Sequence, residues 1–529
     1  MTVTAEKKTE PRAEFLSLPQ ELQCYILGFI PWRDILRFTS VCRALHQTYM
    51  SSCELQYIVE LGGQGLLPLP DINLGDHVPI LKRLQLLREK SRAWLRFNIH
   101  SSKTISIPKQ YYGDQRRFIN GHLFFWRNSQ PEIFPILPEP SQHTIERDWS
   151  RESLCPVDAT IVSIDLDVSQ NLIATAYVMD ETLESDDKRV YIELGALDED
   201  GAPPQAVGRT LFPSELVPIY YYRTHLPTHG RRLIISGKHV ALCHCLDIFD
   251  HEWWLQIWDW QQSTTSNCIL SNTRKSYCPS FSLLGSDRLL VVTGDRLKLY
   301  SIENTSQAPP LLACFLLPIP ESTRIHWIHP LDNIAYSSRL QMQARQTMWT
   351  SDPKDRLLFL NMTGNYHPNL DGPCIIISTR IFFFRELAPV IPWKYWGPLN
   401  TRALLSLTSS YDQEYMNGNR VLRSSLTVTD RGWFRWDSEC DLRMMDFSPL
   451  AVKHHQGSGR VVKEPSTIKV VTGKNEKFVL TTCLPYVEVV SNRKFRADDL
   501  ASIQFDQDRI YLDRYDPLDL SDQVEVITI

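Results

Sequence analysis

The spacing of hydrophobic residues changes at about residue 98, and this change limits which folds the chain can adopt. Before that point apolar residues recur three and four positions apart, the period of an amphipathic helix. After it, short apolar runs alternate with turns that contain Gly, Asp, Asn and Pro, as in successive strands. The sequence therefore predicts an α+β multidomain protein, with a small helical head followed by a large all-β body.

The change of period also predicts where the parts begin and end. We expect a flexible tail at residues 1–13, a helical head at 14–58, a linker and connecting helix at 59–97, and the β body at 98–529. The stretch LGGQGLLPLPDINLGD has the composition of a domain boundary. It indicates separable folding units, so a fragment from about residue 98 is expected to fold alone.

The head reads as two or three helices. Ser17 and Gln20 form a capping-box pattern, and Pro19 falls in the first turn, where proline is tolerated. One apolar stripe contains Leu22, Ile26, Phe29 and Ile30, and a second contains Ile35, Phe38, Val41, Cys42, Leu45 and Tyr49. A module this small cannot bury so many apolar side chains by itself. The surplus surface must contact either a partner protein or the rest of this chain.

The segment LSLPQELQCYILGFIPWRDILRFTSVCRALH resembles the F-box, a motif that ties proteins to a Skp-type adaptor. The matching positions are Leu18, Pro19, Glu21 and Leu22, then Ile26, Leu27, Ile30 and Pro31, then Asp34, Ile35, Leu36, Val41, Cys42 and Arg43. The tryptophan that commonly follows this arginine is absent around Leu45 and His46. The following segment also looks like that of many fungal F-box proteins.

The resemblance implies a function and a set of contact residues. It implies a substrate receptor of an SCF-type ubiquitin ligase, in which the head binds the adaptor, and through it a cullin, while the body binds an unknown target protein. The adaptor-binding residues would be Leu18, Pro19, Leu22, Ile26, Ile30, Pro31, Ile35, Leu36, Val41 and Cys42.

The segment HVPILKRLQLLREKSRAWLRF is predicted to be a basic amphipathic helix between the head and the body. Its apolar stripe would contain Leu81, Leu84, Leu87, Trp94 and Leu95, and its basic residues Lys82, Arg83, Arg88 and Lys90 would face solvent. We expect this helix to bridge the two parts.

The β body shows a weak internal repeat. The runs RLIIS, HVALCHC, WLQIWDW and CIL are followed by FSLL, RLLVV, LKLYSI and LLACFLL, and 42 residues separate Trp258 from Tyr300. Four strands per ~40–45 residues, with Trp-Asp at the third, resemble a WD-repeat propeller blade. Trp258–Asp259 is one such pair, and Trp436–Asp437 is a second candidate. We predict a β-propeller of seven or eight blades, with a stacked pair of β-sandwiches as the alternative.

The composition argues against several classes of protein. The net charge of −5, with both signs mixed, gives no basic stripe for nucleic acid. No apolar run reaches the ~18 residues of a membrane span, and MTVTAEKKTEPRAEF lacks the apolar core of a signal peptide. We therefore expect a cytoplasmic or nuclear protein, or one found in both compartments, without nucleic-acid or membrane partners.

Neither a metal site nor catalysis is predicted. The 12 cysteines are scattered, and the tightest cluster, Cys243, His244, Cys245 and His251, lacks a second ligand pair at zinc spacing. Small residues on one buried face of a strand are the favoured interpretation. No GxSxG, HExxH, P-loop or dinucleotide motif occurs, so we expect no cofactor and no enzymatic activity. Two alternatives remain: an F-box scaffold acting outside the ligase, and a β-propeller enzyme with an accessory head.

Overall fold

The computed structural model describes residues 15–529 except for a set of short segments. These are 69–77, 98, 100–101, 108–114, 120–121, 128–129, 136–146, 149–153, 157–158, 168–169, 180–189, 199, 215–230, 246–252, 273–278, 320–323, 330–347, 364–372, 385, 406–413, 427–438, 454–458, 472–476, 497–499, 507–508 and 517–520. The predicted tail at 1–13 and the Trp436–Asp437 pair lie outside the described residues.

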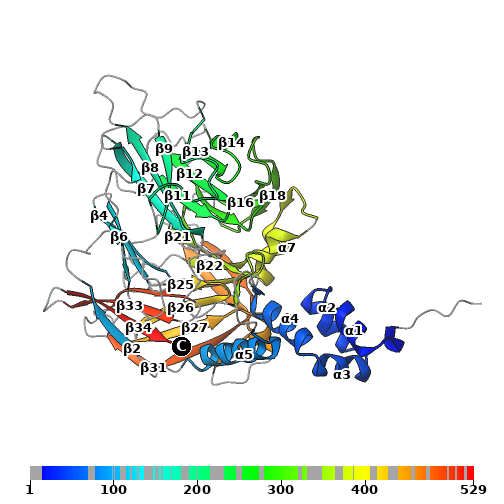
Figure 1. Ribbon diagram of the computed structural model, residues 1–529. Helices are drawn as coiled ribbons and strands as arrows, with labels where there is room; N and C mark the ends of the chain where they lie inside the picture. Colours follow the sequence, from blue (N-terminus) through cyan, green and yellow to red (C-terminus); the bar gives the residue numbers. More distant parts are fainter. Residues whose placement is uncertain are drawn as a thin grey trace, which may run out of the picture.

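The head consists of short helices, and α1–α3 project from one side of the body (Figure 1). Its elements are η1 (Phe15–Ser17), α1 (Gln20–Leu27), α2 (Trp32–Thr39), α3 (Arg43–Ser51) and α4 (Cys53–Gln64). Leu27, Ile35, Leu55 and Val59 form its core. The capping-box prediction is wrong, because Pro19 occupies the N-cap position and no side chain caps α1.

The second predicted stripe is divided between two helices. The backbone of Cys42 is extended, with φ at −151°, so α2 ends at Thr39 and α3 begins at Arg43. Val41 and Cys42 therefore lie in a helix–helix connection, where they do not continue the helical stripe.

The connecting helix α5 (Ile80–Arg96) is present, but it belongs to the body as much as to the head. Trp94 and Phe97 are fully buried in a cluster with body residues such as Leu422, Leu442 and Val487. The predicted boundary at residue 98 therefore cuts through a hydrophobic core. Two details of the predicted stripe are wrong: Leu81 is exposed, whereas Arg83 is buried and donates from Nε to the Val78 carbonyl at 3.0 Å.

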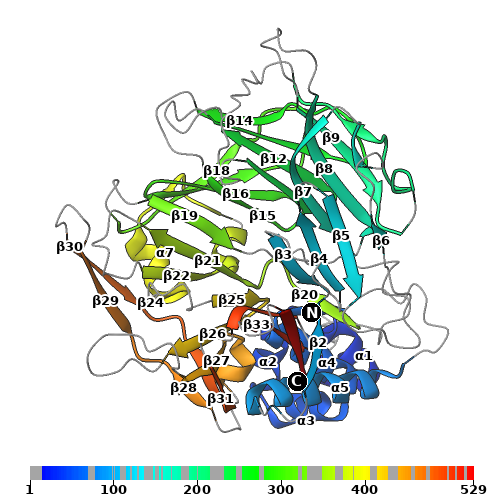
Figure 2. The ribbon, with the colours of Figure 1, turned by 90° about the vertical axis from the view of Figure 1, so that its left-hand side faces the viewer.

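The body is made of successive antiparallel sheets, arranged around a common centre (Figure 2). Three sheets contain four consecutive strands each. They are β3 (Gln115–Ile119), β4 (His122–Arg127), β5 (Gln130–Pro135) and β6 (Arg147–Asp148); β7 (Ala159–Asp167), β8 (Leu172–Met179), β9 (Val190–Ala196) and β10 (Thr210–Leu211); and β11 (Arg231–Ser236), β12 (His239–Cys245), β13 (Trp253–Asp259) and β14 (Cys268–Asn272).

In three further sheets the strands are not all consecutive in sequence. The first has β15 (Ser280–Leu284), β16 (Arg288–Thr293), β17 (Arg296–Ser301) and β18 (Leu311–Leu316), with β23 (Val390–Ile391) added in parallel. The second has β19 (Arg324–His329), β21 (Leu357–Thr363), β22 (Pro373–Ser378) and β24 (Thr401–Leu405). The third has β25 (Glu414–Asn417), β26 (Arg420–Leu426), β27 (Glu439–Asp446), β31 (Tyr486–Arg496) and β28 (Arg460–Val462).

The remaining large sheet joins distant parts of the sequence. Strands β32 (Leu500–Phe505), β33 (Arg509–Asp516) and β34 (Ser521–Thr528) are completed by β2 (Ser102–Ser106). The β2–β34 register runs antiparallel from Ser102 opposite Ile527 to Ser106 opposite Gln523. First strands of neighbouring sheets contact one another, as in the pairs β7–β11, β15–β19 and β25–β32. This arrangement is typical of a β-propeller and does not fit the alternative of stacked sandwiches.

Smaller elements accompany the large sheets. They are the two-stranded pairs β1 (Leu66–Pro68) with β20 (Trp349–Ser351) and β29 (Ser466–Val471) with β30 (Lys477–Thr482), and the helices η5 (Thr379–Phe383), α7 (Trp393–Asn400) and α8 (Pro449–Lys453). Strand β13 is buried over its whole length, because neighbouring sheets cover both of its faces: Trp258 packs in one core cluster, and Leu255 and Ile257 pack in another.

Candidate functional site

The head exposes a group of large apolar side chains. They lie mainly on α1 and around the α2–α3 connection and are Leu22, Tyr25, Ile26, Phe29, Phe38 and Val41. Phe29 is 73% exposed and Val41 is 74% exposed, values unusual for residues of this size. The rings of Tyr25 and Phe29 pack edge to face, with centroids 4.9 Å apart. We call these six residues the head surface, and such clusters typically mark interaction sites.

Most predicted adaptor-binding residues are accessible. Leu22, Ile26, Val41, Pro19 and Pro31 are exposed, and Leu18, Ile30, Leu36 and Cys42 are half-buried. Ile35 is different, since its side chain is fully buried in the head's own core. The prediction of a direct contact through Ile35 is therefore wrong for the head as folded; this residue supports the surface from beneath.

The sequence reasoning missed several members of the head surface. Tyr25 belongs to no predicted stripe, and the sequence places Phe29 and Phe38 in helical stripes without indicating that they are exposed. Tyr25 and Phe29 stand four residues apart, as do Leu22 and Ile26, so α1 and the turn that follows it carry two adjacent apolar rows. A helix of eight residues can pack only one such row against the rest of the head. The two rows in the sequence therefore indicated that one of them would remain exposed.

Buried hydrogen bonds hold the start of the head in place. The side chain of Gln23 is buried on α1, and its Nε2 donates to the Leu18 carbonyl at 2.8 Å. The Thr48 hydroxyl on α3 donates to Gln23 Oε1 at 3.2 Å. These bonds tie the segment around Leu18 to two helices, so that predicted contact residue has a defined position although it precedes α1.

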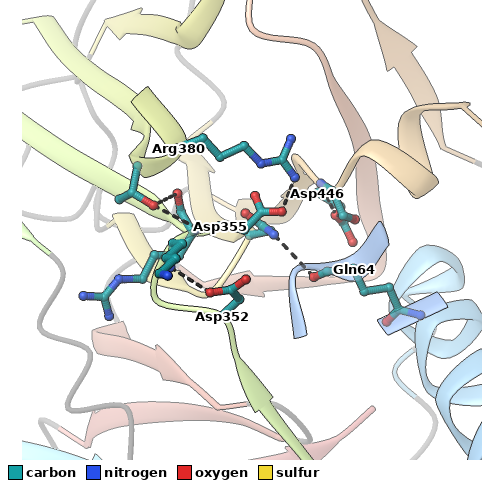
Figure 3. Close-up of polar contacts among 10 residues, drawn as sticks. Gln64, Asp352, Asp355, Arg380 and Asp446 are labelled. Atoms are coloured by element: carbon teal, nitrogen blue, oxygen red, sulfur yellow. Dashed lines mark hydrogen bonds and ion pairs between the residues drawn. The ribbon is translucent and has the colours of Figure 1, made fainter. Parts of the chain in front are cut away.

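The head meets the body through polar contacts at the end of α4 (Figure 3). Asn419 Nδ2 donates to the Gln64 carbonyl at 3.3 Å. Arg380 forms an ion pair with Asp355, and Asp446 accepts from Arg420 Nε at 3.1 Å and from the Ser448 backbone N–H at 2.8 Å. The buried charges of the body at this junction therefore have partners within the chain.

The cluster around Cys243 lies inside a sheet. Cys243 is buried in a core with Leu255, Ile257 and Phe281. His244 is also buried, and strand alternation places it on the opposite face. Within the described residues, no group of three or more His, Cys, Asp and Glu side chains could hold a metal ion.

In the described part of the chain, no helix is both long and apolar enough to cross a membrane.

Comparisons with known proteins add little to this description. No family model matches the chain, and no curated protein matches it. Solved structures similar to it include the WD40 domain of SCAP from fission yeast, with 7% identity, a TM-score of 0.32, and coverage of 77% of this chain and 82% of that one. The AfRom2 CNH domain shows 9% identity, a TM-score of 0.30 and coverage of 81% and 99%.

A third similar structure is the β-propeller domain of the Trilobed protease from Pyrococcus furiosus. It shows 10% identity and a TM-score of 0.29, and the alignment covers 70% of this chain and 93% of that one. Similarities this low carry no information about function.

Proposed function

We propose that this chain is the substrate-recognition subunit of an SCF-type ubiquitin ligase, working in the cytoplasm or the nucleus. The head binds a Skp-type adaptor, and through it a cullin, and the β body binds the target protein. The chain itself is not catalytic: its task is to hold a target beside the ubiquitin-transferring machinery.

One observation carries the proposal. The predicted contact residues are apolar, and all of them except Ile35 are exposed or only partly buried in the folded chain. Burying apolar surface contributes ~25 cal/mol per Å², so an uncovered surface of this kind favours a protein partner. The body does not cover it, because α4 separates α1–α3 from the sheets (Figure 1).

The body's architecture supports the other half of the proposal. We propose that its seven sheets of four or five strands, as far as the described residues define them, are the seven blades of a propeller. The sheet that contains β2 and β34 would then close the ring. Rigid rings of this kind present broad loop surfaces to proteins and peptides.

Adaptor capture tests the head's role. The chain should be co-expressed with a Skp-type adaptor and a cullin, as wild type and as Val41→Glu. A charge at the centre of an apolar interface leaves a buried charge without a partner, so Val41→Glu should lose at least ~30-fold in adaptor affinity. Val390→Glu is the matched control, because Val390 is an exposed valine on the body, 54% accessible. It should bind the adaptor as wild type does.

The outcomes separate the alternatives. Adaptor capture that is equal in both variants, with the head folded, would refute the F-box assignment. Capture of the adaptor without the cullin would instead favour an interaction scaffold outside the ligase.

A further inference from the structure

The chain passes from the head to the body through a tightly packed junction at Gly65. Helix α4 ends at Gln64, and Gly65 follows in the left-handed conformation, with φ at 67° and ψ at 41°. The next residues form β1, which pairs antiparallel with β20 of the body from Leu66 opposite Ser351 to Pro68 opposite Trp349. The head thus contributes a strand to the body immediately after its last helix.

No side chain fits at Gly65. A Cβ atom there would lie 2.1 Å from Asn419 Nδ2 and 2.6 Å from the Asp355 carbonyl oxygen. Both neighbours belong to the body, and one of them is backbone that cannot rotate away. Two hydrogen bonds close the same contact: Asn419 Nδ2 to the Gln64 carbonyl at 3.3 Å, and the Asp352 N–H to the Gly65 carbonyl at 2.8 Å. Figure 3 shows Gln64 and Asp352 at this junction.

A second close approach lies half a turn earlier. A Cβ atom at Gly63 would stand 2.9 Å from Leu450 Cβ, so the end of α4 packs directly on α8 of the body. Beside it, Arg88 of α5 forms an ion pair of 3.5 Å with Glu60 of α4. The end of α4 is therefore held from three directions: by α8, by α5 and by the turns that carry Asp355 and Asn419.

We infer that the contacts of Gly65 with Asp352, Asp355 and Asn419 are an orientation lock, which fixes the head at one angle to the body. In a flexible linker the backbone carbonyl and N–H groups would be hydrogen-bonded to water. Here the Gln64 and Gly65 carbonyls accept hydrogen bonds from groups of the body. The functional consequence rests on the proposed function: the lock would hold a captured target at one distance from the adaptor.

The test uses the full chain and two glycines with the same backbone conformation. Gly285 has φ at 65°, but a Cβ atom there would meet nothing closer than 3.7 Å. Gly65→Ala and Gly285→Ala therefore carry the same backbone strain, and only Gly65→Ala forces the junction apart. Hydrogen exchange, read residue by residue, measures the difference.

We expect Gly65→Ala to accelerate exchange at residues 62–68 and 349–352 by at least ~10-fold, with α1–α3 and the body sheets exchanging as in Gly285→Ala. Small-angle scattering should show a wider range of shapes for Gly65→Ala alone. Equal exchange in the two variants at the junction would overturn the lock.

A second variant covers the case in which Gly65→Ala does not fold. Asn419→Ala removes the bond to Gln64 without adding bulk, so it should also accelerate exchange at the junction, and unchanged exchange there would overturn the lock. Adaptor capture is measured in parallel on every variant. If the wild-type chain did not capture the adaptor, the proposed function would be refuted. The exchange result, and hence the lock, would still stand.

Discussion

The ring of Trp94, on the helix that follows the head, lies 5.7 Å from the ring of Phe505, on strand β32 of the body. The guanidinium group of Arg420 stands over the same Trp94 ring at 5.2 Å. Residues more than 400 positions apart in sequence therefore share one core, and α5 is part of the body's structure.

Trp94→Ala should destabilise the whole body. Trp94 is fully buried, and replacing a buried Trp by Ala costs about 3–5 kcal/mol of unfolding free energy. Leu81→Ala, on the same helix but 55% exposed, should change stability by less than about 0.5 kcal/mol. Chemical denaturation of both full-length variants gives the comparison. Similar stabilities would show that α5 is only a connection.

The same contact explains what the sequence could predict about the fold. The change of hydrophobic period identified the helical head and the β body, because periodicity is a local property. The sequence could not show that Trp94 and Phe97, before the boundary predicted at residue 98, pack into the body's core, because their partners are strands hundreds of residues away. Helical spacing also could not tell that Leu81 faces solvent while Arg83 is buried, since that depends on which elements pack against α5.

The head surface shows the same limit. Most of the residues that the F-box resemblance indicated are accessible, but the resemblance could not predict which of them would be buried in the head's own core. Ile35 and Val41 belong to one apolar stripe in sequence. Helix α2 ends at Thr39, between the two residues, so Ile35 faces the core and Val41, in the connection that follows, faces solvent.

His239 should make the protein sensitive to acid. Burial on β12, helped by the charge of Lys238, lowers the pKa of His239 to about 4, against the opposing effect of Asp259. The folded state thus prefers the neutral imidazole, whereas the unfolded chain binds a proton at its ordinary pKa of about 6.5. The stability from this group is present above pH ~6.5 and is lost as the pH falls toward 4.

The contribution of His239 to the loss of stability at acid pH can be measured by replacing this residue. His239→Phe should lose less stability than wild type between pH 7 and pH 4.5, by up to about 3 kcal/mol. His46→Phe, at an exposed position on α3, should follow the wild-type profile. Parallel profiles for all three proteins would mean that His239 is not desolvated in solution.

Removal of metal ions should leave the protein unchanged. Cys243 is packed among apolar side chains, and His244 lies on the other face of the strand, so the two cannot share an ion without breaking the sheet. A chelator should therefore leave the melting temperature where it was. A full equivalent of zinc by elemental analysis, lost in Cys243→Ser, would contradict this account of the cluster.

Ile35→Ala and Val41→Ala should separate support from contact in the head. Ile35 fills the head's core, so its truncation should cost about 2–4 kcal/mol of head stability, while adaptor affinity at low temperature stays near the wild-type value. Val41 touches solvent over most of its surface, so Val41→Ala should leave stability within about 0.5 kcal/mol and weaken adaptor capture by up to about tenfold. Calorimetry of adaptor binding, combined with thermal melts of the same samples, gives both quantities. If Ile35→Ala weakened capture while the helices stayed intact, Ile35 would have to contact the adaptor, and the head would have to open when it binds.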